Sequence, residues 1–415
     1  MQPHNFLTRS IAAHPRRASV TRILHAALRA ADAGRAVKRY LRAQPLPKAK
    51  RIFAFGLGKA SAAMTSALAQ TTRLADALVI TKHASHLDGL AGAVVAGNHP
   101  IPGADSLAAG RAARRFLARL TADDLLLCLL SGGGSALMAD PVIALEELQA
   151  LTASLLASGA TIQQVNTVRR HLDWLKGGGV IQRANEARVI SLILSDVVGD
   201  SLETIVSGPT APDPTTNADA AEIARRALPF RETPKPGDPI FARVENRIIA
   251  NNRMVLEAAQ RQARREGFLA EIIERELTGE ARDAGKSLAE SLVLATRRLL
   301  RPFCLIAGGE TTVTVRGTGQ GGRNQEFALA AVDILRDINK VMLVSMATDG
   351  EDGPTDAAGA VTTGETAARA ESLAMAAPAF LSTNDAYAYF KNLGDLIRIG
   401  PSGTNVNDLV LLFGF

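Results

Sequence analysis

The stretch Asp124-Leu-Leu-Leu-Cys-Leu-Leu-Ser-Gly-Gly-Gly-Ser-Ala-Leu-Met138 decides the fold expected of this chain. Leu125 to Leu130 is an unbroken apolar run, of a length that suits a strand buried on both faces of a parallel sheet. The glycines that follow allow positive φ and let an anion approach the backbone N–H groups, and the flanking serines add hydroxyl donors. The sequence therefore predicts a strand, a phosphate-binding loop and a short helix capped by Ser135. The loop residues are Ser131, Gly132, Gly133, Gly134 and Ser135. A tight structural turn is the alternative.

Strands and helices alternate on both sides of this stretch. We expect strands at 51–55, 77–80, 93–95, 125–130 and 189–194. We expect helices within 20–41 and at 61–70, 106–120, 145–156 and 161–175. This alternation predicts an α/β fold with a doubly wound, mostly parallel sheet, in which ligands bind beyond the carboxyl ends of the strands.

Prolines cluster between Pro209 and Pro239, which indicates a boundary between two lobes. We expect domains at 1–235 and 236–415, with the first helix able to pack on the other lobe. The second, smaller α/β lobe should contain helices at 242–266, 281–300 and 324–335 and strands at 270–274, 303–307, 311–315, 341–346 and 409–413.

Composition bounds the class of protein. Hydrophobic residues make up 47% and charged residues 21%, as in ordinary globular proteins, and no apolar run approaches the ~20 residues that span a bilayer. The net charge of +6 comes from dispersed arginines, and aromatic residues reach only 4%, so we expect neither nucleic-acid nor membrane binding. Both cysteines lie in apolar runs, which suits a cytoplasmic protein. His83, His86 and His99 could suggest a zinc site, but His83 and His86 lack a third ligand at convincing spacing, and we interpret Asn98-His-Pro100 as a shaped turn.

Gly56-Leu-Gly-Lys-Ala-Ser61 follows a strand and opens a helix, so Gly56 and Gly58 invite a dinucleotide-binding interpretation. That fingerprint needs glycine or alanine at position 61 and an acid after the second strand, where Thr81-Lys82 stands instead. Lys59 is more informative, because a lysine at a helix start is unfavourable for the helix dipole unless it meets an anion. A solvated surface lysine is the alternative.

The segment from Gly317 to Glu326 carries the strongest local signal. Its glycines, among them Gly319, Gly321 and Gly322, lead into Arg323 and Asn324 at the start of a helix. A guanidinium over a glycine loop suits phosphoryl oxygens. Gly285-Lys286-Ser287 ends like a P-loop, but Glu280 stands where the first glycine is required, so we interpret it as a helix start.

Polar side chains at helical spacing and acids after strands complete the candidates. Asn166, Arg169, Asp173 and Lys176 share one face of the helix 161–175, either as a ligand-binding face or as a solvated one. Acids such as Asp196, after the strand 189–194, can hold Mg²⁺ or accept a proton, or simply form turns and caps.

Taken together, these motifs resemble the class II glycerate 2-kinase family, whose C-terminal part is called the MOFRL domain. The matching stretches are GLGKAS, GNHPIPGADS, LLSGGGSALM, NTVRRHL, LSDVVGDSLETIVSGPTAPDPTT, GGETTVTVRGTGQGGRNQEFALA, ATDGEDGPTDAAGA and GPSGTNVNDL, the last of which contains Asn405. The likeness runs from about residue 20 to the C-terminus. Asp173 and Ser402 depart from the usual family pattern.

The resemblance implies a Rossmann-like N-terminal domain, a C-terminal MOFRL domain and an active site in the cleft between them. It implies ATP-dependent phosphorylation of the 2-hydroxyl of D-glycerate with Mg²⁺. Lys59 and Arg323 match the basic pair thought catalytic in the family. We expect Glu310 or Asp349 to hold Mg²⁺ and Asp196 to accept the hydroxyl proton.

Two other functions stay open. Members of the family have been labelled hydroxypyruvate reductases, which would use NAD(P)H. A non-catalytic binder of phosphorylated metabolites would need no turnover. The sequence does not settle whether the protein forms a homodimer.

Overall fold

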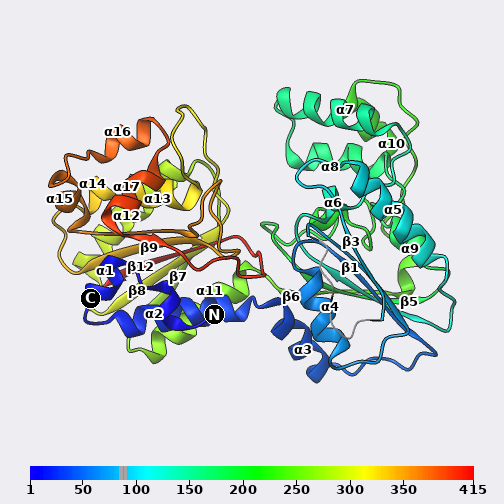
Figure 1. Ribbon diagram of the computed structural model, residues 1–415, viewed down its shortest axis with the longest axis horizontal. Coiled ribbons are helices and arrows are strands. Elements are labelled where there is room, and N and C mark those ends of the chain that lie inside the picture. The colour runs from blue at the N-terminus through cyan, green and yellow to red at the C-terminus, as the bar shows by residue number, and fades with distance from the viewer. Residues whose placement is uncertain (84–86, 88–90) are drawn as a thin grey trace. The chain divides into compact units, whose positions relative to one another are not determined.

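The computed structural model describes residues 1–83, 87 and 91–415, so His86 lies outside the described residues. Two compact units form: an N-terminal unit, Ala33–Ala250, and a C-terminal unit, Met1–Asp32 with Asn251–Phe415 (Figure 1). The predicted domain bounds, 1–235 and 236–415, stay a prediction. None of the helices in the described part of the chain has the length and apolarity needed to cross a membrane.

The N-terminal unit is built on a six-stranded sheet in the order β3-β2-β1-β4-β5-β6, with every neighbouring pair parallel. This order is that of a doubly wound dinucleotide-binding fold. The strands are β1 (Ile52–Leu57), β2 (Asp76–Thr81), β3 (Ala93–Ala96), β4 (Leu125–Leu130), β5 (Arg188–Leu194) and β6 (Val244–Ala250). The predicted doubly wound parallel sheet is therefore confirmed.

Helices cover both faces of this sheet (Figure 1). They are α3 (Ala33–Ala43), α4 (Ser61–Ala69), α5 (Ala104–Leu117), α6 (Gly134–Leu137), α7 (Leu145–Ala157), α8 (Ile162–His171), α9 (Gly179–Gln182) and α10 (Asn217–Ala224), with 3₁₀ turns η2 (Ile205–Ser207) and η3 (Pro239–Arg243). Every residue of β4 is buried, at 0–1% exposure. Because each buried leucine stabilises the fold by about 1.5–3 kcal/mol, β4 fixes the loop that follows it.

The C-terminal unit has a mixed sheet in the order β11-β10-β9-β12-β8-β7. Its strands are β7 (Leu269–Leu277), β8 (Phe303–Gly309), β9 (Val341–Ala347), β10 (Gly359–Thr363), β11 (Leu396–Ile397) and β12 (Asp408–Gly414). Only β7 and β8 are parallel; β12 runs antiparallel between β8 and β9. The N-terminal end of β12 therefore lies beside the carboxyl ends of β8 and β9.

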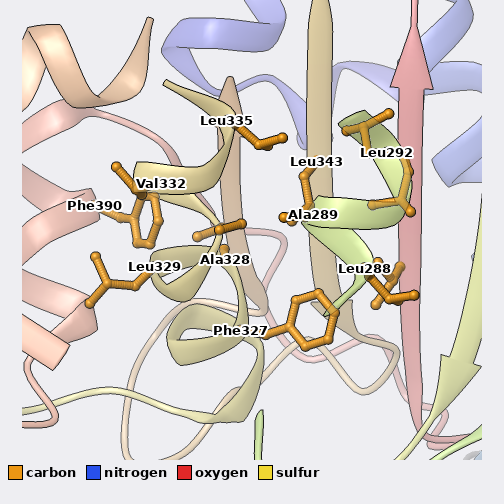
Figure 2. Packing of buried hydrophobic residues seen from close by; sticks show 14 of the residues in the cluster. Leu288, Ala289, Leu292, Phe327, Ala328, Leu329, Val332, Leu335, Leu343 and Phe390 are labelled. Atoms are coloured by element: carbon orange, nitrogen blue, oxygen red, sulfur yellow. The ribbon is translucent and has the colours of Figure 1, made fainter. Parts of the chain in front are cut away.

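Helices α2 and α11 lie on one face of the C-terminal sheet, and α12, α13 and α17 lie on the other (Figure 1). The helices of this unit are α1 (Arg9–Ala13), α2 (Arg17–Ala30), α11 (Asn252–Arg265), α12 (Ala281–Arg298), α13 (Arg323–Ala330), α14 (Val332–Leu335), α15 (Thr366–Glu371), α16 (Ala377–Ser382) and α17 (Ala386–Leu393), with the 3₁₀ turn η1 (Pro3–Phe6). Figure 2 shows how α12 and α13 share one apolar core with β9 and α17. This packing fixes α13, at whose first turn Arg323 lies.

Gly285 explains the false P-loop. A methyl group on Gly285 would lie 2.3 Å from the carbonyl oxygen of Phe327, so this glycine lets α12 approach α13 closely. Gly285-Lys286-Ser287 therefore lies in the first part of α12, where Gly285 contacts α13, and its interpretation as a helix start is confirmed.

Some predicted elements are wrong. The segment 242–266 is not one helix: 244–250 forms β6, paired with β5, and α11 begins only at Asn252. The expected single helix within 20–41 is interrupted, because α2 ends at Ala30 and α3 begins at Ala33 in the other unit. The expected strand 311–315 is limited to an isolated bridge between Glu280 and Thr312. Strands β10 and β11 were not predicted.

Candidate functional site

The loops after β1 and β4 lie against each other, because these strands are neighbours at the point where the strand order reverses. The Lys59 N–H donates to the Gly132 carbonyl (2.9 Å), and the Ala60 N–H donates to Ser131 Oγ (3.0 Å). A methyl group on Gly58, whose φ is +120°, would lie 2.0 Å from the Ser131 carbonyl oxygen. The predicted site residues at these two loops are thus brought together.

The N–H groups of the β1–α4 turn are already used. Besides Lys59 and Ala60, the Gly58 N–H donates to the Ile80 carbonyl (3.0 Å) and the Ser61 N–H to the Gly58 carbonyl (3.3 Å). Gly58 therefore has a packing role, and a nucleotide-binding role for Gly56 and Gly58 stays a prediction. A pyrophosphate that binds this fold at the first turn needs those N–H groups free.

The loop after β4 is different. The N–H groups of Gly132, Gly133, Gly134 and Ser135 have no acceptor among the described residues. Gly133 has a φ of +85° and is the N-cap residue of α6. Four successive N–H groups without an intramolecular partner form a concave donor surface for an anion. We call residues 132–135 the N–H cradle; the N–H of Ser131, just before it, donates to the Leu57 carbonyl (2.9 Å).

Ser135 does not cap α6, so that prediction is wrong: the N-cap residue is Gly133, and the helix begins at Gly134. The Ser135 hydroxyl instead shares a 2.8 Å hydrogen bond with the Ser207 hydroxyl, which donates in turn to Asn166 Oδ1 (3.3 Å). Val206 and Ser207 both have positive φ, +57° and +59°. A β-branched residue in this region is strained, and such strain persists where the surroundings hold a functional group in place.

Arg169 lies one helical turn beyond Asn166, so both occupy the same face of α8. Its half-buried guanidinium makes no hydrogen bond or ion pair with the described residues, and burial lowers its pKa. Asp173 and Lys176 do not belong to this face. They lie beyond the end of α8 and form a buried ion pair of 2.7 Å. The Lys176 ammonium also donates to the Met138 carbonyl (2.9 Å).

Lys59 and Asp196 flank the cradle. Lys59 is exposed and has no side-chain partner in the described part of the chain, as expected of a group that meets a ligand. A methyl group on Gly132 would lie 1.8 Å from Asp196 Oδ2, so this carboxylate lies directly against the loop. The structure thus brings Lys59, the cradle and Asp196 together within the N-terminal unit.

The second cluster lies in the C-terminal unit, where the carboxyl ends of β8 and β9 meet the start of β12. Arg323 donates from Nε and Nη2 to the two carboxylate oxygens of Asp408 (2.6 and 3.0 Å), and its Nη1 lies 3.1 Å from Glu310 Oε1. Burial works against the charge of Arg323, but Asp408 and Glu310 together raise its pKa above the ordinary value. Arg323 is therefore held by two acids, unlike Lys59.

The glycine loop before Arg323 is closely packed. Methyl groups on Gly319 and Gly322 would lie 2.4 Å from Asp385 Cβ and 2.3 Å from the Asp352 side chain. No residue from 317 to 322 has positive φ. These glycines allow close backbone approach, so their number does not require a ligand. Gly321, whose methyl group would meet only ordinary contacts at 3.4 Å, is the exception.

Asp352 fixes the start of α13. Its carboxylate accepts from the Asn324 and Gln325 N–H groups (3.1 and 2.9 Å), and Asn324 Nδ2 donates to it as well. The pKa of Asp352 is raised to about 7, mainly because the carboxyl group is buried and also because the Asp408 carboxylate is near it. Asn405 lies in the turn before β12, where its Oδ1 accepts from the Asn407 N–H. The binding roles predicted for Asn324 and Asn405 remain untested.

Metal ligands were predicted at Glu310 and Asp349. Among the described residues, no group of three or more His, Cys, Asp or Glu side chains is arranged to hold a metal ion. Glu310 follows β8 and pairs with Arg323, while Asp349 follows β9 and accepts from the Glu351 N–H (3.1 Å). Mg²⁺ in phosphoryl-transfer sites commonly takes one or two carboxylates plus substrate phosphates, so two acids of this kind are a sufficient protein contribution.

Sequence reasoning missed several residues of these clusters. Ser207 lies in the quoted stretch LSDVVGDSLETIVSGPTAPDPTT but received no role, and its positive φ has no sequence signal. Asp408 and Asp352 belong to the quoted family stretches, yet only the antiparallel placement of β12 brings Asp408 to Arg323. His99 was interpreted as part of a shaped turn.

The fold, the cluster around the cradle and the cluster around Arg323 together define the class: an α/β protein whose parallel sheet has an N–H cradle beyond the carboxyl end of β4. The family described as "Domain of unknown function (DUF4147)" matches residues 19–236, and the MOFRL family matches residues 303–408. The chain belongs to the glycerate 2-kinase (DUF4147/MOFRL) family.

The chain is 40% identical to a D-glycerate 2-kinase of Thermotoga maritima, over 89% of this chain and 92% of that protein. It is 37% identical to a protein of Agrobacterium vitis named provisionally as a hydroxypyruvate reductase, over 94% and 92%. The crystal structure of a glycerate kinase from Thermotoga maritima is similar, with a TM-score of 0.89 and 38% identity, over 95% of this chain and 98% of that one.

Proposed function

We propose that this protein transfers the γ-phosphoryl group of ATP to the 2-hydroxyl of D-glycerate, giving 2-phospho-D-glycerate and ADP. The relatives named as glycerate 2-kinases support this reaction. The observation that carries it in this chain is the contrast between two neighbouring loops. The N–H groups of the β1–α4 turn are occupied, whereas those of the cradle after β4, residues 132–135, have no acceptor among the described residues.

That contrast also argues against a nicotinamide oxidoreductase. A dinucleotide bound in the usual way places its pyrophosphate on the first turn of this fold, where the N–H groups of Lys59 and Ala60 already donate to the β4 loop. Ser61, in place of the required glycine or alanine, is fully buried and donates its hydroxyl to the Gly58 carbonyl (2.7 Å). In this proposal the anion binds to the cradle after β4 and not to the β1–α4 turn.

In the proposed mechanism the cradle N–H groups bind phosphoryl or carboxylate oxygens, and Lys59 and Arg323 stabilise the transferring phosphoryl group. Asp196, against Gly132, accepts the proton of the attacking hydroxyl. Asn166 and Arg169 bind a further anionic or polar group of the nucleotide or substrate.

Mg²⁺ would be held by Glu310 and Asp349, whose carboxylate oxygens are the ligands this ion prefers. When bound, it would neutralise charge on the ATP phosphates. The ion pair of Glu310 with Arg323 would link such a site to the guanidinium.

A coupled ADP assay tests the proposal. ADP should appear only when D-glycerate, ATP and Mg²⁺ are all present, and phosphorus NMR should identify the 2-phosphate. Oxidation of NAD(P)H by hydroxypyruvate without ADP release would identify the reductase instead. Binding of ATP or glycerate without any turnover would identify a non-catalytic binder.

A further inference from the structure

His99 lies beside the N–H cradle although it comes from a third loop, between β3 and α5. Gly97 in the same loop packs against α6, since a methyl group there would lie 2.0 Å from the Leu137 carbonyl oxygen. A methyl group on Gly133 would lie 3.2 Å from His99 Cδ2, 3.3 Å from His99 Nε2 and 3.2 Å from Lys59 Cγ. The imidazole, the stem of Lys59 and the cradle therefore meet at one point.

The turn around His99 is held by other groups. Asn98 Oδ1 accepts from the Asp105 and Ser106 N–H groups (3.0 and 3.4 Å), and Asn98 Nδ2 donates to Asp105 Oδ2 (3.0 Å). His99 itself makes no hydrogen bond or ion pair with any residue in the described ranges, and it is half-buried. Its ring nitrogens are therefore available to a ligand.

The two charged side chains that influence the His99 imidazole are both lysines, Lys59 and Lys82. Burial first, then Lys59 and Lys82, lower the pKa of His99, so the ring is neutral at neutral pH. A neutral imidazole offers one donor and one acceptor. An anionic oxygen can pair only with the N–H donor, whereas an alcohol hydroxyl can either accept from the N–H or donate to the other ring nitrogen.

We propose that His99 hydrogen-bonds the 3-hydroxyl of the glycerate acceptor, the hydroxyl that is not phosphorylated. This inference rests on the proposed function. Asp196 lies against Gly132 and His99 against Gly133, so two adjacent loop residues each present one polar side chain. The two hydroxyls of glycerate stand on neighbouring carbons. With Asp196 on the attacking 2-hydroxyl, His99 is left to the 3-hydroxyl and selects acids that carry it.

D-Lactate, which is glycerate without the 3-hydroxyl, is the probe. In His99→Ala, kcat/KM for glycerate should fall about tenfold, as expected when one hydrogen bond of a partly buried site is lost. D-Lactate, measured by turnover or as a competitive inhibitor, should be handled equally by wild type and variant. The KM for ATP should not change. His99→Asn, whose amide also donates and accepts, should recover part of the loss for glycerate only.

An exposed histidine after β2 provides a matched control, and His83→Ala should behave as wild type. Equal losses for glycerate and D-lactate in His99→Ala, or no loss for either, would overturn the inference. A raised KM for ATP would assign His99 to the nucleotide and would overturn it too. If the wild-type protein releases no ADP with glycerate, the proposed function itself fails, which is a distinguishable result.

Discussion

The chain contains two glycine loops that each lie beside a basic residue, and the structure makes different use of them. The four N–H groups of the cradle after β4 have no acceptor among the described residues, and the cradle lies beside Lys59, whose side chain pairs with none of those residues either. The loop before α13 uses its glycines for close packing and ends in Arg323, which is already bound by Asp408 and Glu310. The first loop keeps donors that the described residues do not use, while the basic residue of the second loop is bound within its own unit. Glycine content alone does not distinguish the two.

Arg323 should therefore contribute to stability as well as to activity. In Arg323→Ala the buried Asp408 carboxylate loses its bidentate partner, and removing one member of such a pair costs about 3 kcal/mol of unfolding free energy. We also expect kcat to fall by roughly 10²-fold if the guanidinium stabilises the transferring phosphoryl group. Denaturant unfolding and steady-state kinetics measure the two effects separately.

Removing both partners provides the control. An Arg323→Met/Asp408→Leu double variant should unfold at higher denaturant concentration than Arg323→Ala, because no buried carboxylate is left unpaired. Wild-type stability in Arg323→Ala would show that the second loop is not internally satisfied, and the contrast between the loops would disappear.

Lys59→Ala should show the opposite pattern. Because Lys59 is exposed and pairs with no described side chain, its removal should change the unfolding free energy by less than about 0.5 kcal/mol. The kcat should still fall by roughly 10²-fold or more, equivalent to ~3 kcal/mol of transition-state stabilisation. The same assays apply, with exposed Lys286→Ala of the false P-loop as a control expected to match wild type. Near-normal turnover of Lys59→Ala would remove the assignment.

How much of this contrast the sequence could predict depends on the range of the contacts. The run Leu125–Leu130 and the glycines after it carry local signals, so β4 was predicted with its correct bounds and the glycine turn directly after it, although the start of α6 was not. β6 was missed because Val244–Ala250 was assigned to the helix that follows, although Asn251 caps α11 and separates the two elements; pairing with β5 makes the segment a strand. The partners of Arg323 come from distant segments, so its ion pairs could not be foreseen.

The pH dependence of the unfolding free energy tests the packing of the second loop around Asp352. Its folded-state pKa is raised to about 7, so between about pH 5 and 7 the folded protein keeps a proton that the unfolded chain has lost. Stability from this group is therefore present at low pH and is lost as the pH rises through 7, by about 2 kcal/mol over that interval. The unfolding free energy of wild type minus that of Asp352→Asn, measured across this range, should decline with pH. A flat difference would mean that the two N–H donors of α13 keep Asp352 ionised throughout.

The smallest predicted effect separates the two uses of glycine within a single loop. Gly319 and Gly321 both have ordinary φ, but a methyl group on Gly319 would lie 2.4 Å from Asp385 Cβ, whereas one on Gly321 would meet nothing closer than 3.4 Å. Gly319→Ala should therefore lower the unfolding free energy by about 1 kcal/mol through overpacking, and Gly321→Ala should cost less than about 0.5 kcal/mol. If the loop serves packing alone, Gly321→Ala keeps the wild-type KM for ATP and glycerate. A raised KM in that stable variant would instead return the second loop to the ligand-binding surface, because no packing defect would explain it.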